Sequence, residues 1–224
     1  MEYESVLRSL ESDFQSCNHT LDSLLWAEDK YWQWTDDHID RRMSFSSFLN
    51  DAAPLCTSLH ALITKHKNID TMLKQFAHHK RTLPICCCAI LNSALDKILL
   101  VRGRGGFLQL PGGKKACNET EMQCAAREVH EETGVHVEDK LMEKHCIRIP
   151  AMRRTGKHGI SIINCTVYIV VLSELPGPLR PRSYEEIREI KWVHLKQIHK
   201  AGCLSDALKK AKGLLNSWIT AHKK

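Results

Sequence analysis

A stretch of 23 residues does more than any other feature to limit what this chain can fold into. It runs from Gly113 through five residues to Glu119, and then through seven residues to the run Arg-Glu-Val-His-Glu-Glu-Thr-Gly-Val at 127–135. Three glutamates of that run stand at positions i, i+3 and i+4, so an α-helix would project their carboxylates from one face. The stretch therefore predicts an acidic helix that follows a glycine-rich loop.

The helix is expected to run from Thr120 to Glu132. Thr120 and Gln123 have the spacing of a capping box, and Gly134 stands where a left-handed residue would end the helix. Apolar residues at 122, 125, 126 and 129 form a stripe on another side. One face of the helix is therefore predicted to be buried and the other acidic.

The acidic face predicts a site for a divalent metal and phosphate. Like charges four residues apart destabilise a helix by roughly 0.2–0.5 kcal/mol per pair, so Glu128, Glu131 and Glu132 need a counter-charge. Mg²⁺ takes oxygen ligands and commonly bridges carboxylates to substrate phosphates. The alternative is a solvated acidic helix, which the fixed spacing and the neighbouring glycine loop make the weaker interpretation.

Residues 113–135 match the complete Nudix signature, so the segment resembles that family of enzymes, which hydrolyse a nucleoside diphosphate linked to another group. The resemblance implies that Glu128, Glu131 and Glu132 bind Mg²⁺ or Mn²⁺ and act in catalysis. The metal would polarise a phosphoryl oxygen and activate water for in-line attack. Residues implied to support this site are Glu119, Arg127 and Gly134, and residues implied to meet the substrate phosphates are Gly113, Lys114 and Lys115.

Length and composition favour one catalytic domain with an extension. The chain has 224 residues, of which 43% are hydrophobic and 26% charged, and no apolar run approaches the roughly 20 residues that span a bilayer. The first 20 residues do not read as a secretory signal, so we expect an intracellular protein without a membrane partner. The ten cysteines include three in succession at 86–88, and we expect reduced, mostly buried thiols.

The two ends of the chain carry opposite charge. Residues 1–37 hold nine acidic and two basic side chains, for a net charge of −7, and residues 188–224 hold nine basic and two acidic ones, for +7. A basic end favours a polyanion such as RNA, although a solvated helix face would look the same. The lysines expected to follow RNA are Lys209, Lys210 and Lys212.

The periodicity predicts two parts joined near a proline. Helical spacing occurs over 3–17, about 19–38, 45–52 and 66–79, so residues 1–80 read as a small all-helical module. The pattern breaks at 80–84, where we place a hinge before Pro84. Strands are then expected at 85–91, 97–102, 108–110, 147–149, 160–172 and 189–194, and an amphipathic helix at 205–222.

The expected fold class is therefore α+β. An N-terminal all-helical module at 1–80 would precede a Nudix α/β/α sandwich domain at 84–200 and a basic C-terminal helix at 201–224. This layout resembles the decapping members of the Nudix family, which are the catalytic subunits of mRNA decapping complexes. The resemblance covers nearly the whole chain and implies a regulatory, cap-binding helical module that binds an activator subunit.

A second point of resemblance lies on the second predicted helix. Glu28, Trp32 and Asp36 follow one another at i+4 spacings and match a family pattern whose Trp and Asp contact the cap base. A tryptophan face can stack on a cationic 7-methylguanine while a carboxylate accepts hydrogen bonds from its amino edge. Trp26 and Trp34 remain alternatives for the stacking role, and Trp32 could instead pack in the core of the module.

A third point is the segment 186–192, Glu-Ile-Arg-Glu-Ile-Lys-Trp, which resembles the family segment whose glutamate is the general base. Glu186 is the candidate base, because a carboxylate away from the metal helix can take the proton of the attacking water. Glu185 adjoins it and could fill the same role. Either carboxylate could instead pair with Arg182 or Arg188 in a loop.

The resemblance implies hydrolysis of the 5′ cap of mRNA to 7-methylguanosine diphosphate and 5′-monophosphate RNA, in the cytoplasm and with P-bodies as one candidate site. The chain departs from the decapping pattern at 110–114, where Leu-Pro-Gly-Gly-Lys replaces Phe-Pro-Lys-Gly-Lys. The Pro-Gly-Gly form is common in enzymes of small nucleotides. The alternative function is therefore a diphosphatase for small nucleotides or diphosphoinositol phosphates.

Overall fold

The structure is a computed structural model that describes residues 2–18, 20–38, 40, 43–155, 159–173, 177–181 and 186–223. The chain forms two compact units. One unit contains Met1–Leu83 together with Ala116–Glu119, and the other contains Pro84–Lys115 and Thr120–Lys224. We call them the helical unit and the sheet unit and describe each separately.

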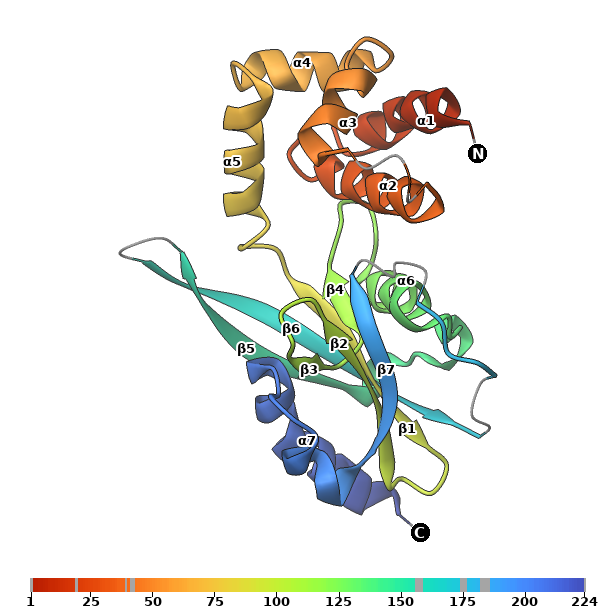
Figure 1. Cartoon of the computed structure of the whole chain (residues 1–224). Coiled ribbons are helices and arrows are strands. Elements are labelled where there is room, and N and C mark those ends of the chain that lie inside the picture. Colours follow the sequence, from red (N-terminus) through yellow and green to blue (C-terminus); the bar gives the residue numbers. More distant parts are fainter. Residues whose placement is uncertain are drawn as a thin grey trace. The chain divides into compact units, whose positions relative to one another are not determined.

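In its described residues, the helical unit contains five helices (Figure 1). The sequence predicted four of them and missed the fourth, whose first turn is capped by the Cys56 thiol, which accepts a hydrogen bond from the Leu59 N–H. A cysteine is not a usual capping residue, so this helix start carries no sequence signal. The helices are α1 (Tyr3–Ser16), α2 (Ser23–Asp37), α3 (Phe45–Ala52), α4 (Thr57–Lys65) and α5 (Ile69–His79).

One apolar core holds the helical unit together. Leu10 and Phe14 of α1 are fully buried and meet Leu24 of α2, Phe48 of α3 and Met72 of α5 in the same cluster. Residues three and four apart on an amphipathic helix share a face, which is why these positions converge. Burying a side chain of this size contributes roughly 1.5–3 kcal/mol.

A disulfide attaches the loop Ala116–Glu119, which belongs to the helical unit, to the residue after α1. Cys17, directly after α1, is bonded to Cys117, and their Cα atoms lie 5.7 Å apart. The expectation that all ten cysteines are reduced is therefore wrong for this pair, because a sequence separation of 100 residues gives no sign of the pairing. In the described part of the chain the other eight cysteines form no disulfide, and six of them are buried.

The described part of the sheet unit contains seven strands and two long helices (Figure 1). Its mixed sheet has the order β3-β2-β1-β6-β5, with β4 paired to β1 and β7 paired to β2. The strands are β1 (Ile85–Asn92), β2 (Lys97–Gly103), β3 (Leu108–Gln109), β4 (Gly112–Lys114), β5 (Cys146–Thr155), β6 (Gly159–Leu172) and β7 (Ile187–His194). The helices are α6 (Glu121–Thr133) and α7 (Asp206–His222).

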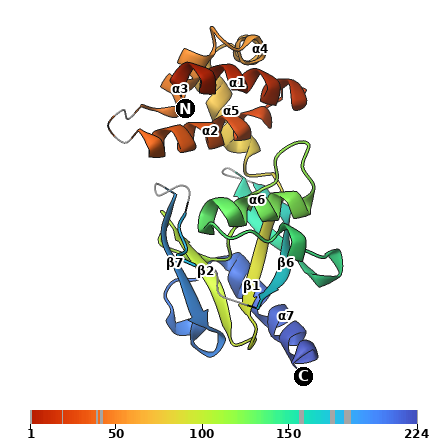
Figure 2. The same cartoon turned by 90° about the vertical axis from the view of Figure 1, so that its right-hand side faces the viewer.

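Strand β1 lies between the two helix layers and is buried on both faces. Cys86 and Cys88 of β1 pack in the cluster that contains α6, whereas Cys87 and Ala89 pack in the cluster that contains α7. Side chains of a strand alternate between the faces of a sheet, so successive residues serve opposite layers. The two helices consequently cover opposite faces of the sheet (Figure 2). This is the expected α/β/α arrangement.

The C-terminal helix packs on the sheet through its apolar stripe. Leu208, Ala211, Leu215 and Ile219 of α7 are buried at spacings of three and four residues. The amphipathic pattern predicted from the sequence is therefore satisfied by packing within the sheet unit.

Among the helices in the described part of the chain, none has both the length and the apolar character needed to cross a membrane.

Candidate active site

Helix α6 carries the predicted metal-binding glutamates, and its own residues set its ends. The Thr120 side chain accepts a hydrogen bond from the Gln123 N–H, and the Gln123 side chain accepts one from the Thr120 N–H, which completes the predicted capping box. Gly134 ends the helix in the left-handed conformation, with φ 75°. The helix is anchored on the sheet by Ala125 and Val129, which are buried.

The three glutamates differ in burial and in contacts. The Glu132 carboxylate is buried at 6% exposure and accepts a hydrogen bond of 2.8 Å from the Gly112 N–H. The side chains of Glu128 and Glu131 are 16% and 24% exposed. The Glu132 carboxylate is therefore the most deeply buried of the three and lies against β4, whereas the carboxylates of Glu128 and Glu131 are partly buried.

Arg127 links the other two carboxylates. Its Nη1 lies 3.0 Å from Oε1 of Glu128 and 3.1 Å from Oε2 of Glu131. Its Nη2 donates to the Lys114 carbonyl at 3.3 Å, which ties the helix to β4. This guanidinium supplies positive charge at the flank of the acidic face, as the sequence predicted.

The two glycines of β4 allow the strand to lie against both β1 and α6. A Cβ atom on Gly113 would lie 2.3 Å from the Glu128 carboxyl carbon, and one on Gly112 would lie 2.3 Å from the Cys86 carbonyl oxygen. Real Cβ atoms do not approach other atoms so closely, so neither position accepts a side chain without movement. The Gly112 that replaces the lysine of the decapping pattern is therefore required by the way β4 packs in this chain.

Burial makes the acidic cluster hard to ionise. Loss of water raises the pKa of Glu128 to about 8, an effect that Arg127 opposes and that Glu131 and Glu186 increase. Burial also raises the pKa of Glu132 well above its usual range, with Glu128 adding to the effect and the Gly112 N–H opposing it. Both shifts mean that the ionised form of each carboxyl group is unfavourable in a place where water does not offset its charge.

Glu186 belongs to the same electrostatic cluster although it lies 54 positions beyond Glu132 in the sequence. The Glu186 carboxylate raises the pKa of both Glu128 and Glu132, so the three charges lie close enough to interact. Glu186 is itself exposed, directly before β7. Glu185, the alternative candidate for the base, and Arg182, a candidate ion-pair partner, lie outside the described residues.

The residues fit a divalent cation in charge and in ligand type. Two buried carboxylates with raised pKa values would be stabilised by a dication, and carboxylate oxygens are the ligands that Mg²⁺ and Mn²⁺ prefer. No group of three His, Cys, Asp or Glu side chains among the described residues has the geometry of a complete metal site. Arg127 instead forms the ion pairs with Glu128 and Glu131.

Glu119 has a local role. It accepts a hydrogen bond of 2.6 Å from the Ala116 N–H, which closes the loop ahead of α6. The loop residues Ala116–Glu119 belong to the helical unit, whereas the glutamates of α6 belong to the sheet unit. Glu119 thus contacts its own loop, and its support of the metal site stays a prediction.

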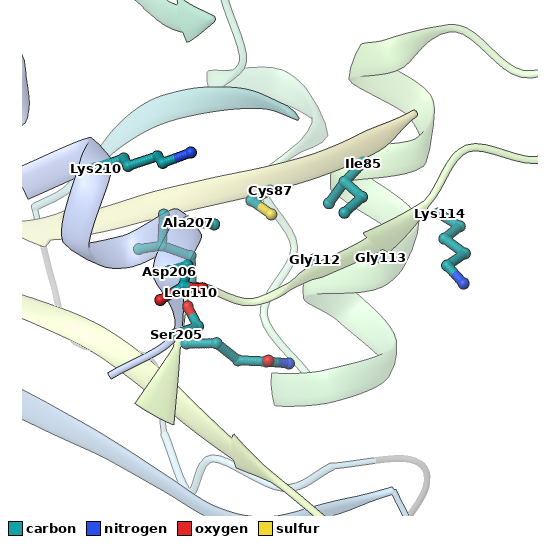
Figure 3. A pocket seen from close by; sticks show the side chains of 11 residues that line it. Ile85, Cys87, Leu110, Gly112, Gly113, Lys114, Ser205, Asp206, Ala207 and Lys210 are labelled. Atoms are coloured by element: carbon teal, nitrogen blue, oxygen red, sulfur yellow. The ribbon is translucent and has the colours of Figure 1, made fainter. Parts of the chain in front are cut away.

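A cavity of about 590 Å³ lies between β1, β4 and the first turn of α7 (Figure 3). Lys114 of β4 and Lys210 of α7 line it together with Gly113, and Lys210 donates a hydrogen bond of 3.0 Å to the Pro150 carbonyl. Figure 3 shows the Cys87 side chain of β1 directed into this space. The cavity brings two predicted phosphate-binding lysines to the glycine strand.

The remaining predicted lysines are not part of this cavity. Lys212 lines a second cavity of about 500 Å³ along the later part of α7, where His194, Lys196 and Lys223 also lie. Lys209 is exposed and pairs with Asp206. Lys115 is held by its backbone N–H, which donates to the Pro84 carbonyl at 3.0 Å. The three lysines of α7 therefore face different surroundings and do not form one row.

The helical unit places the predicted cap-reading residues on α2. Trp32 and Asp36 are both half-buried, and Trp32 packs against the core beside the Tyr31 ring, with ring centroids 4.8 Å apart. Trp34 is only 4% exposed and stacks on His38, so it is a core residue and cannot offer an open face to a base. Trp26 is half-buried like Trp32 and remains the alternative for stacking.

Sequence reasoning did not predict that Cys87 and the first residues of α7 line this cavity. Cys87 appears in the sequence only as part of an apolar run, and the Ser205 cap of α7 is far from β1 along the chain. The alternation of β1 could have shown that Cys87 faces the layer opposite α6. The position of the α7 start could not be found from spacing alone.

Comparison with known proteins identifies the family of the chain. A model of the NUDIX domain matches residues 80–213. The chain is 28% identical over 202 residues to "mRNA-decapping enzyme subunit 2" of Arabidopsis thaliana, which covers 88% of this chain and 50% of that protein. It is 28% identical over 180 residues to "m7GpppN-mRNA hydrolase" of Saccharomyces cerevisiae, covering 79% of this chain and 18% of that protein.

The chain thus spans half or less of the length of these relatives. Among solved structures, the MutT NUDIX hydrolase of Burkholderia pseudomallei aligns with a TM-score of 0.46 at 21% identity, over 58% of this chain and 95% of that one. The domain match covers more than half of the chain and contains α6, the glycine strand and Glu186. The chain therefore belongs to the Nudix family and is similar to its mRNA-decapping members.

Proposed function

We propose that this protein hydrolyses the 5′ cap of mRNA, releasing 7-methylguanosine diphosphate and leaving RNA with a 5′-monophosphate. The similarity to decapping enzymes carries this proposal, because its 202 aligned residues exceed the length of the matched Nudix domain. The alignment therefore includes residues outside that domain. A helical unit followed by a Nudix unit is the layout that the decapping resemblance implies.

The residues of α6 would hold the metal. Glu128, Glu131 and Glu132 offer carboxylate oxygens to Mg²⁺ or Mn²⁺, and Arg127 keeps two of them oriented. The bound metal would polarise a phosphoryl oxygen and favour a nucleophilic water. Gly112 fixes the orientation of Glu132 through its N–H, so the carboxylate is positioned before substrate binds.

Glu186 is assigned as the general base. A base must lie near the attacking water, and Glu186 is exposed while its carboxylate interacts electrostatically with those of Glu128 and Glu132. Its position ahead of β7 separates it from the residues of α6. It can therefore take the proton of a water that the α6 carboxylates help to place.

Substrate contacts are divided between the two units. In the helical unit, Trp32 would stack on the cap base and Asp36 would accept hydrogen bonds from it. In the sheet unit, Lys114 and Lys210 line the cavity beside Gly113 and would meet phosphates. A rotation about the boundary at Leu83 and Pro84 would bring the two sets of contacts to one substrate.

The proposal places the protein in mRNA turnover in the cytoplasm, with P-bodies as one candidate site and an activator subunit as partner of the helical module. An activator that binds the helical module would act on the closing motion, because that module carries the cap contacts. The sequence similarity to decapping subunits, which extends over most of the chain, supports this setting. Fluorescent tagging and co-purification with the helical unit as bait would test it.

A defined transcript tests the reaction. Capped RNA of tens of nucleotides, labelled with ³²P in the cap, is incubated with the protein and Mg²⁺ or Mn²⁺, and the products are separated by chromatography. Labelled 7-methylguanosine diphosphate and 5′-monophosphate RNA are expected. The alternative, a diphosphatase for small nucleotides or diphosphoinositol phosphates, predicts that those compounds turn over far faster than capped RNA, and that outcome would overturn the proposal.

A further inference from the structure

The segment Ala116–Glu119 lies between the glycine strand β4 and the catalytic helix α6 in sequence, yet it packs with the helical unit. The chain consequently passes from one unit to the other three times, after Leu83, after Lys115 and after Glu119. Only the first crossing is the hinge predicted from the sequence. The other two frame a loop that leaves the sheet unit and returns to it immediately before α6.

Three kinds of contact hold this loop in the helical unit. The Ala116 side chain is 3% exposed and belongs to the apolar core of that unit. The Asn118 side chain donates a hydrogen bond to the Ser16 carbonyl at the end of α1. The third contact is the covalent bond between Cys17 and Cys117. The disulfide therefore reinforces a contact that noncovalent packing also makes.

The loop is next to residues of the proposed reaction. The Glu119 carboxylate accepts a hydrogen bond from the Ala116 N–H within the loop, and the following residue, Thr120, caps α6. On the other side, Lys114 accepts the Arg127 hydrogen bond with its carbonyl. Cys117 thus attaches the chain three residues after Lys114 and three residues before Thr120, the residues through which β4 contacts Arg127 and α6 begins.

We propose that the Cys17–Cys117 bond is a redox-operated clamp that fixes the Ala116–Glu119 loop to the helical unit and restrains the movement of that unit relative to the catalytic helix. A dithiol reductant opens the clamp: two electrons and two protons pass from the dithiol to the bond, giving two cysteine thiols and one oxidised dithiol. A small disulfide oxidant of the glutathione type closes it by thiol–disulfide exchange, which returns two electrons to the oxidant.

The surroundings of the two sulfurs suit exchange. Cys17 is 4% exposed, whereas Cys117 is half-buried next to the exposed Asn118, so a reductant can approach the bond from the side of the loop. Exchange requires access of a thiolate to one sulfur, and disulfides that solvent reaches are the labile ones. The buried position of Cys17 keeps its thiol near the end of α1 for re-formation.

The clamp has a mechanical consequence. With the bond closed, three chain crossings join the units and the loop cannot leave the helical core. With the bond open, the loop loses its covalent attachment and keeps the noncovalent contacts of Ala116 and Asn118, and the crossing after Leu83 can act as a hinge. This consequence rests on the proposed function where it concerns decapping, because that reaction requires the helical unit to close on the cap.

The first experiment examines the clamp without reference to activity. The oxidised and dithiol-treated proteins are digested without reduction, and peptides are mapped by mass spectrometry. A linked peptide pair that contains Cys17 and Cys117 is expected only in the oxidised sample. Hydrogen exchange at residues 116–119 is expected to be several-fold faster after reduction, and equally fast under both conditions in Cys17→Ser.

Cys203→Ser is the matched control, because Cys203 is exposed and forms no disulfide in the described part of the chain. It should keep the response to reductant. Absence of the linked pair in the oxidised wild type, or equal exchange at 116–119 in its two redox forms, would overturn the clamp. These readouts do not depend on which substrate the protein hydrolyses.

The second experiment asks whether the clamp controls turnover of capped RNA. Turnover is expected to be at least threefold slower in the oxidised wild type than in the reduced form, to recover on dithiol addition, and to be insensitive to redox state in Cys17→Ser. Equal turnover in both wild-type forms would overturn the regulatory role. If neither form cleaved capped RNA, the decapping proposal would fail, and the peptide map would still decide the clamp.

Discussion

Gly113 approaches the carboxylate of Glu128 so closely that a Cβ atom at residue 113 would lie 2.3 Å from its carboxyl carbon. The atom in the way is the end of a flexible side chain, which can rotate. Gly113→Ala is therefore expected to move the Glu128 carboxylate and to lower kcat by about 10–100-fold, as displaced support of a metal ligand does, while changing the free energy of unfolding by less than about 1 kcal/mol. Kinetics with capped RNA and urea unfolding measure the two effects.

Two further glycines serve as contrasts. Gly213→Ala adds the same methyl group where nothing lies within 4 Å, so kcat should not change. Gly112→Lys restores the residue of the decapping pattern but meets the backbone of Cys86 and Cys87, so it should lower the free energy of unfolding by about 2 kcal/mol or more. A Gly113→Ala enzyme with full activity would remove the assigned role of Glu128.

Glu131→Gln is expected to lower turnover of capped RNA by more than about 100-fold with little change in RNA affinity, because it removes a charged oxygen ligand without altering the shape of the site. Glu186→Gln should lower kcat by about 10²–10⁴-fold and abolish the acidic limb of the pH–rate profile, as loss of a general base does. Rapid-quench kinetics and filter binding measure the two quantities.

Glu121→Gln is the matched control for these variants. It lies on the first turn of the same helix and pairs with Arg148 at the surface, away from the acidic cluster. It should leave turnover unchanged. Unchanged product formation by the Glu131 variant would contradict the metal-binding assignment, and an unaltered pH profile of the Glu186 variant would contradict the assignment of the base.

Trp32→Ala is expected to weaken binding of capped RNA selectively, by about tenfold, because loss of one stacking contact costs about 1–3 kcal/mol. Binding of the same RNA with a 5′-monophosphate should be unaffected. Trp34→Ala provides the contrast, since Trp34 is buried in the helical core and its truncation should cost about 3–5 kcal/mol of stability. An equal loss on capped and uncapped RNA in the Trp32 variant would indicate a packing role.

Lys210→Ala is expected to weaken binding of capped RNA of every length and to reduce the slope of log K against log salt by about 1, because Lys210 lines the cavity next to Gly113. Lys212→Ala removes a side chain from the other cavity, so its effect should appear only with longer RNA. Titrations of capped 5-mers and 30-mers at several salt concentrations separate the two. A Lys212→Ala effect that is the same on 5-mers and 30-mers would contradict the assignment of the two lysines to different cavities.

The sequence predicted helix α6 closely because the residues that set its limits lie within it or next to it. Thr120, Gln123 and Gly134 act on their own neighbours, so spacing alone locates them. Strand β4 was not predicted, since two glycines carry no strand signal and their pairing with β1 is a tertiary contact. Helix α4 was also not predicted, because it begins at Cys56 and a cysteine is not a usual capping residue.

Contacts between distant parts of the chain account for what the sequence could not show. The bond between Cys17 and Cys117 depends on how the α6 loop packs on α1. Lys210 and Lys212 line different cavities because of how α7 is rotated about its own axis on the sheet. The proximity of Glu186 to the acidic helix was suggested only by resemblance to a family, because no residue spacing connects them.

Stability of the protein without added dication is expected to fall as the pH rises. The pKa of Glu128 is about 8 in the folded protein against an ordinary value of 4.5, mainly through burial. Between these values the folded chain retains a proton that the unfolded chain has released, and stability decreases with pH wherever the native state binds more protons. The contribution is complete below pH 4.5 and is lost as the pH passes 8, a change on the order of a few kcal/mol.

Mg²⁺ should reverse this dependence, because the metal binds the ionised carboxylates and releases the protons that the folded protein holds. Urea unfolding between pH 5 and pH 8.5 measures the effect, once with chelator and once with Mg²⁺. The stabilisation by Mg²⁺ is expected to grow with pH in the wild type. Glu128→Gln should lose part of the downward slope in chelator, since its amide does not titrate, and should gain less from Mg²⁺. A slope that is the same in wild type and variant, or a Mg²⁺ effect that does not change with pH, would show that the buried carboxylate of α6 is not the group that couples protons, metal and stability.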